Sequence, residues 1–273
     1  ARSKQRSTYT SGAVRPELGM KRQDAVFAAS LVAVALAPAV ADARSADGGF
    51  RLVVEAVAES RQRSASGETE GRLTLQPKLE GDGLASAKAF RIRVSAAADA
   101  TGRDVLPEEP EPSRWEVRPS GTGLWIVLGS PARGAAFVDV SGTIALWIPS
   151  RDAGAEARIP RALARPGAPL AASTLRSEGV TLRVAPRVAD APTVVSLRGS
   201  AADVERVRTV RVLRPDGTEI SASSLQVTIA EGKGSLELIL AEPPPADATL
   251  VLGLLTRRSV VAVPFELKGV ALP

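Results

Sequence analysis

Hydrophobic and polar residues alternate along much of the chain from Phe50 onward. In segments such as 180–184 (VTLRV) and 225–229 (LQVTI), an apolar residue stands at every second position. This period places apolar side chains on one face of a strand and polar side chains on the other. Further segments of this kind lie at residues 90–94, 236–240 and 261–267. One buried and one solvated face is typical of antiparallel sheets, so the sequence predicts an all-β protein.

Turn-forming residues separate the predicted strands. Asp99–Gly102, Pro215–Gly217 and Glu231–Gly234 each supply residues that tolerate a positive φ or preset a turn. Pro264 lies inside a strand pattern. Because proline cannot donate a hydrogen bond to a neighbouring strand, we expect its strand at a sheet edge.

Helical periodicity is weak throughout. The best helical segment, 158–170, is interrupted by Pro160, Pro166 and Pro169. We therefore expect residues 151–177 to form a linker between a first β-sandwich at 44–150 and a second at 178–273.

An internal repeat supports two similar domains. Residues 124–140 match 236–252 in apolar pattern, and an Asp/Gly turn precedes each copy, near Asp99 and near Asp216. Shared strand patterning accounts for part of this match, because it recurs in any sandwich. In architecture, short strands without helical crossovers resemble immunoglobulin-like and fibronectin-like sandwiches. The expected fold is two tandem antiparallel β-sandwiches.

Residues 20–43 have the features of a secretory signal peptide. Basic residues follow Met20, an apolar run covers 25–40, and small residues occupy alternate positions up to Ala43. A membrane anchor is the alternative, but the run is shorter than the ~20 residues of a span and contains Pro38. We expect residues 1–19 to be upstream or non-native sequence, or disordered. The mature protein is then periplasmic or extracellular, with no stable membrane span.

The net charge and the missing residue types limit the partners and the catalytic mechanisms that the chain can use. The net charge is +5, but residues 44–273 contain 29 bases and 27 acids, so we expect no nucleic-acid partner. The chain has neither Cys nor His, which excludes disulfides, thiol nucleophiles and imidazole bases. We expect no metal and no cofactor. Asp99 and Asp104 are followed by Glu108, Glu109 and Glu111, but these acids lack the ligand spacing of a calcium loop, so they predict a hairpin turn followed by an acidic loop.

Three aromatic residues form the candidate surface for a partner or ligand. We expect strands at 124–128, 135–140 and 143–148, the last two joined by a three-residue loop at Ser141–Thr143. This arrangement places Trp125, Phe137 and Trp147 together, opposite an aliphatic face. Either the strand near 52–57 or the other domain covers them, or they bind a ligand.

These features favour an exported, non-catalytic structural or protein-interaction module of the bacterial cell envelope. Its partner would be another envelope protein or a glycan, bound at the aromatic surface or by strand addition at the edge strand 259–267. One alternative is a carbohydrate-binding module, which requires Trp125 and Trp147 exposed on one flat face. The other is a carboxylate-dependent glycan hydrolase, which requires opposed acids in a cleft.

Overall fold

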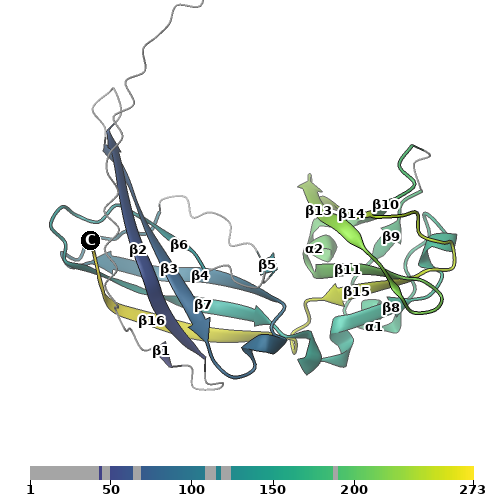
Figure 1. Ribbon diagram of the computed structural model, residues 1–273, viewed down its shortest axis with the longest axis horizontal. Coiled ribbons are helices and arrows are strands. Elements are labelled where there is room, and N and C mark those ends of the chain that lie inside the picture. The colour runs from purple at the N-terminus through teal and green to yellow at the C-terminus, as the bar shows by residue number, and fades with distance from the viewer. Residues whose placement is uncertain (1–42, 45–49, 64–68, 108–114, 118–123, 187–189) are drawn as a thin grey trace, which may run out of the picture. The chain divides into compact units, whose positions relative to one another are not determined.

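A computed structural model describes residues 43–44, 50–63, 69–107, 115–117, 124–186 and 190–273. Strands account for 55% and helices for 11% of the structure, and four antiparallel sheets are present, so the all-β prediction is confirmed (Figure 1). The predicted leader lies outside the described residues except for Ala43. Within the described ranges, no helix has the length and apolar character needed to cross a membrane.

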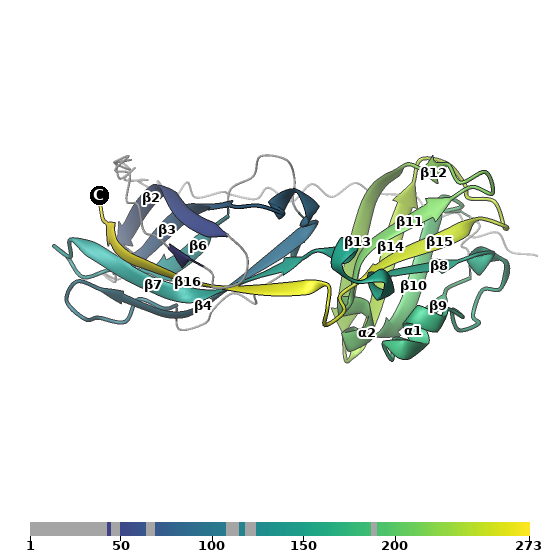
Figure 2. The same ribbon diagram turned by 90° about the horizontal axis from the view of Figure 1, so that it is seen from below.

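The first sandwich consists of two four-stranded sheets, seen as two layers in Figure 2. One sheet contains β1 (Ala43–Arg44), β2 (Arg51–Arg63), β3 (Thr69–Glu80) and β6 (Ile126–Gly129), in that order. The other contains β16 (Val260–Ala271), β7 (Phe137–Trp147), β4 (Ala89–Asp99) and β5 (Glu116–Val117). A 3-10 turn, η1 (Leu84–Ser86), precedes β4. Alternate residues of both sheets, such as Leu73 and Ile144, are buried in one shared core.

The second sandwich also has two sheets around one core. Its first sheet contains β13 (Ala222–Ala230), β14 (Lys233–Leu240), β10 (Val194–Ser200) and β9 (Leu182–Val184). The second contains β12 (Glu219–Ile220), β11 (Val207–Leu213), β15 (Thr249–Leu254) and β8 (Glu156–Ile159). The described helical elements of this part are η2 (Pro149–Arg151), η3 (Ala153–Ala155), η4 (Ala162–Ala164), α1 (Ser173–Ser177) and α2 (Ala201–Glu205).

Strand pairing crosses the domain limits expected from the sequence. The expected linker, 151–177, contains β8, which pairs with β15 from Leu250 to Gly253. Strand β16, expected in the second sandwich, pairs with β7 in the first. The chain thus leaves the first sandwich after β7, forms the second and returns as β16. Pairing partners this distant in sequence leave no mark on local periodicity, which explains the difference.

The expected hairpin at Ser141–Thr143 is wrong, because β7 is one continuous strand of 11 residues. Gly142 sits in its middle without a positive φ. A Cβ there would lie 2.2 Å from the Arg93 carbonyl oxygen and 2.8 Å from the Phe265 ring. Glycine serves a close approach of neighbouring strands here rather than a turn.

The two sandwiches share part of their strand order. The adjacent strands β4 and β7 correspond in position to β11 and β15, and β3 and β6 correspond to β10 and β14. The turns after β4 and β11 also match: the Gly102 amide donates to the Asp99 carbonyl, and the Gly217 amide donates to the Arg214 carbonyl. Strand β13 precedes β14 and has no counterpart among the described residues of the first sandwich; residues 118–123, before β6, lie outside them.

The predicted strands and turns are otherwise confirmed. All five alternating segments lie wholly or mainly in strands, at β4, β9, β13, β14 and β16. Glycines 102, 217 and 232 have positive φ angles at the three predicted turns. Strand β16, which contains Pro264, pairs with β7 alone among the strands that the structure describes and ends its sheet, as expected.

Candidate functional site

The structure does not bring the three predicted aromatic residues together. Trp125 precedes β6, in one sheet of the first sandwich, and its side chain is 56% exposed. Phe137 begins β7, in the other sheet, and is 38% exposed. Trp147 ends β7 and is buried. Ten residues of extended strand separate Phe137 from Trp147 by about 33 Å. The predicted aromatic surface is therefore not formed by these side chains.

Trp147 has a packing role. Its indole Nε1 donates a 3.0 Å hydrogen bond to the carbonyl oxygen of Leu254, at the end of β15. Its ring lies against Gly253, where a Cβ would be 2.7 Å from the ring. A buried indole with a satisfied N–H is typical of a core or a packed junction, so Trp147 is not an exposed stacking platform.

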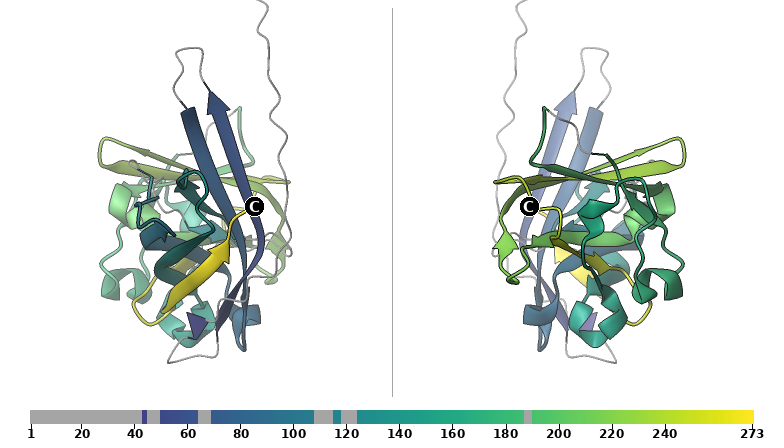
Figure 3. Two further views of the ribbon diagram at one scale, coloured as in Figure 1. Left: turned by 90° about the vertical axis from the view of Figure 1, so that its left-hand side faces the viewer. Right: turned by 90° about the vertical axis from the view of Figure 1, so that its right-hand side faces the viewer.

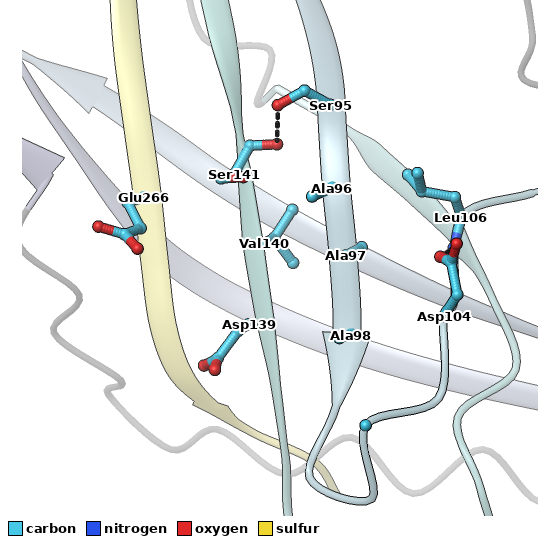
Figure 4. A pocket seen from close by; sticks show the side chains of 11 residues that line it. Ser95, Ala96, Ala97, Ala98, Asp104, Leu106, Asp139, Val140, Ser141 and Glu266 are labelled. Atoms are coloured by element: carbon cyan, nitrogen blue, oxygen red, sulfur yellow. Dashed lines mark hydrogen bonds between the residues drawn. The ribbon is translucent and has the colours of Figure 1, made fainter.

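A shallow hollow of about 380 Å³ lies on the outer face of the β4–β7–β16 sheet (Figure 4). Small side chains, including Ala96 and Ala98, form part of its lining. The Ser95 hydroxyl on β4 donates a hydrogen bond to the carbonyl oxygen of Ser141 on the adjacent strand β7. The hollow results from small residues on neighbouring strands, and it has three acids around it.

Each of these acids has a partner within 3.0 Å. The Leu106 amide donates to Asp104 at 2.8 Å, the Gly269 amide donates to Asp139 at 2.7 Å, and the Lys268 ammonium pairs with Glu266 at 3.0 Å. Strand β4 runs between Asp104 and the other two acids (Figure 4). The residues that line this hollow therefore present no pair of unengaged, opposed carboxylates of the kind that glycoside hydrolysis uses.

Asp99 organises the turn after β4, where the sequence predicts a hairpin. Its Oδ1 accepts hydrogen bonds from the Thr101 hydroxyl at 2.6 Å and from the Thr101 amide at 2.9 Å, while its Oδ2 accepts one from the Ala132 amide at 2.7 Å. The Thr101 hydroxyl, followed by the Ala132 amide, lowers the pKa of Asp99 to about 2. The carboxylate is thus used by the protein itself, between β4 and the loop before β7.

Among the described residues, strand β13 is unusual because it is an edge strand with exposed apolar side chains. Among the described strands it pairs only with β14, so its other side is a free sheet edge (Figure 1). Its apolar residues continue the core-facing row, but only Leu225 packs against the core. Val227 is 51% and Ile229 45% exposed, and with Trp125 and Phe137 they are the large exposed hydrophobic residues of the part of the chain that the structure describes. Strand β13 thus combines unpaired backbone with an uncovered apolar row.

The cause of this exposure is the position of β13 at the edge of its sheet, opposite a very short strand. The β13–β14 hairpin, yellow-green in Figure 3, turns at Glu231 and Gly232, and β10 pairs with β14 as far as Lys233, beside that turn. In the opposite sheet, the short strand β12 ends at Ile220, which is itself buried. The end of β13 near the turn is left without a covering strand.

Sequence alternation assigned Leu225, Val227 and Ile229 to a buried face, and for the last two this is wrong. The strand itself was predicted, but its exposure was not. One sequence feature does mark it: residues 222–230 (ASSLQVTIA) contain no charged residue and no proline. Natural edge strands usually carry such residues to prevent association, so their absence identifies a candidate interaction edge.

Comparison with known proteins adds no identification. No protein-family description matches the chain, and neither the curated proteins nor the solved structures contain a match to it.

Proposed function

We propose that this chain is an exported, non-catalytic protein-interaction module of the bacterial cell envelope and that β13 is its binding element. The observation that carries the proposal is an uncharged free edge with Val227 and Ile229 exposed beside it. An edge of this kind binds by strand addition, in which backbone hydrogen bonds supply affinity and alternate side chains supply specificity.

The remaining surfaces favour this role over the two alternatives. A glycan-binding module needs aromatic rings on one face, whereas Trp147 is buried and Trp125 precedes a strand of the sheet opposite that of Phe137. A carboxylate-dependent hydrolase needs two free acids that face each other, and the acids of the sheet hollow are engaged with backbone amides or Lys268.

Export and an immunoglobulin-like character belong to the same proposal. The basic and apolar pattern of residues 20–43 supports a cleaved leader. The correspondence of β4 and β7 with β11 and β15 supports two related sandwiches of immunoglobulin-like type. Mass spectrometry of the protein secreted by a Gram-negative host should find a new N-terminus at Asp42 or Arg44. An intact leader retained in the membrane fraction would contradict export.

Site-specific photo-crosslinking tests the binding element. A photoreactive amino acid at position 227 should give a discrete crosslinked protein in the periplasm of the producing cells. The matched control places the same amino acid at Trp125, which is equally exposed but does not lie on β13. Equal crosslinking from both positions, or none from position 227, would reject β13 as the binding element.

A further inference from the structure

We infer that the partner of β13 is a second copy of this chain, paired antiparallel through β13 about a two-fold axis. This inference rests on the proposed function and names its partner. The joined sheets would run continuously from β9 through both β13 strands to the second β9. Three features of β13 support the self-pairing. They are the outward direction of the backbone groups of its apolar residues, the side chains that a two-fold axis would bring opposite each other, and its lack of charge.

The hydrogen-bonding alternation of β13 decides which of its N–H and C=O groups point away from β14. The β13–β14 hairpin has a two-residue loop, since Ala230 pairs with Lys233. The residues that flank such a loop form a hydrogen-bonded pair, and the alternation of an antiparallel ladder then turns the N–H and C=O groups of Leu225, Val227 and Ile229 away from β14. The same three residues therefore offer both backbone groups and apolar side chains at the edge.

Side-chain parity fits a two-fold axis. In a symmetric antiparallel pair, the axis is perpendicular to the sheet, so each residue faces one of the same parity. The regular ladder of β13 covers 224–230, because a bulge interrupts it between Ala222 and Ser224. This segment is centred on Val227. Val227 would then face Val227 of the second copy, and Leu225 would face Ile229.

Charge favours a second copy over an unrelated strand. In a two-fold pair, a charge at the centre faces its own like charge, which destabilises the pairing. Residues 222–230 are free of charge, and the nearest acid, Glu231, would lie opposite the neutral Ser223. An uncharged strand has no means of selecting an oppositely charged partner, whereas it meets the requirement for pairing with itself.

Sedimentation velocity of the full chain, as a concentration series, tests the inference. The wild-type protein should approach twice the chain mass as its concentration rises. Val227→Lys should weaken self-association by at least about tenfold, because two ammonium groups would face each other across the axis. The matched control is Thr228→Lys, in which each lysine faces Gln226 of the other copy, and it should retain most of the association. Circular dichroism should show both variants folded.

A charge-pair experiment fixes the register. Val227→Glu alone should be monomeric, while a mixture with Val227→Lys should restore a species of two chains, one of each kind. Wild-type protein that stays monomeric at every concentration, or equal loss from both lysine variants, overturns the two-fold pairing. The crosslink from position 227 separates the two failures: an adduct with a different protein overturns only the second copy as partner, whereas the absence of any adduct overturns the binding element itself.

Discussion

The edge strands β16 and β13 share the same alternation of apolar and polar residues, but their apolar side chains differ in burial. On β16, the apolar residues Val263 and Phe265 are buried, and Pro264, Lys268 and a bulge interrupt the free edge. On β13, Val227 and Ile229 are exposed, and no charge or proline stands between Ala222 and Ala230. The free edge of the first sandwich is thus protected against strand addition, whereas that of the second is available for it.

Shortening an apolar side chain should affect the free energy of unfolding strongly on β16 and weakly on β13. Phe265→Ala should lower the free energy of unfolding by about 3–5 kcal/mol, because it leaves a cavity in the first core. Ile229→Ala should change it by less than about 1 kcal/mol, because the side chain is already half exposed. Urea denaturation at low protein concentration measures both. Similar losses for the two variants would mean that β13 is covered in solution.

The next effect on stability concerns the close contact between β16 and β7 at Gly142. Gly142→Ala should destabilise the protein by about 1–3 kcal/mol, since its methyl group would meet the Arg93 carbonyl and the Phe265 ring. Gly129→Ala is the matched control, because a Cβ there lies 3.3 Å from its nearest neighbour, the Val105 carbonyl oxygen. Urea denaturation should rank Gly142→Ala as the more damaging change. The reverse order would contradict the close packing of Phe265 over β7.

Acid should distinguish the turns of the two sandwiches. The folded-state pKa of Asp99, about 2, lies below the ordinary 3.8, so its ionised form stabilises the fold above about pH 4. That contribution is lost as the pH falls from about 4 to about 2. The Thr218 hydroxyl also lowers the pKa of Asp216, but this carboxylate is exposed, so its contribution should be smaller.

Urea midpoints measured from pH 7 down to pH 2 provide the test. Asp99→Asn should flatten the acid limb of the stability profile more than Asp216→Asn does. An unchanged acid limb in Asp99→Asn would show that other carboxylates govern acid unfolding.

The smallest effect on stability, with a visible effect on association, should follow removal of the protecting residues of β16. Replacing Pro264 and Lys268 by threonine removes only one exposed ion pair, with Glu266, so the free energy of unfolding should change by less than about 1 kcal/mol. Sedimentation should nevertheless show increased self-association. If association does not increase, the bulge near Leu267 rather than these side chains protects the edge.

Local features of the fold were predictable, and contacts between distant segments were not. The strand at 225–229 and the turns at Gly102 and Gly217 followed from period and turn chemistry. The hairpin expected at Gly142 was wrong because glycine allows both a turn and a close approach of strands, and the sequence does not distinguish them. The linker expected at 151–177 was wrong because the partner of β8 lies about ninety residues further along the chain.

The candidate site was recoverable only in part. The absence of charge in 222–230 is visible in the sequence, but its meaning depends on knowing that β13 is an edge strand. The aromatic surface expected from Trp125, Phe137 and Trp147 failed because their sheets and burial depend on tertiary pairing.

The alternation of residues, the positions of the turns and the missing chemistry can be read from the amino-acid sequence, since they depend on neighbouring residues and on composition. The pairing of β16 in the first sandwich, the burial of Trp147 and the exposure of Val227 and Ile229 depend instead on the tertiary structure. An apolar strand face becomes a core only where a second sheet lies over it. Whether a sheet lies there depends on strands that are distant in the chain.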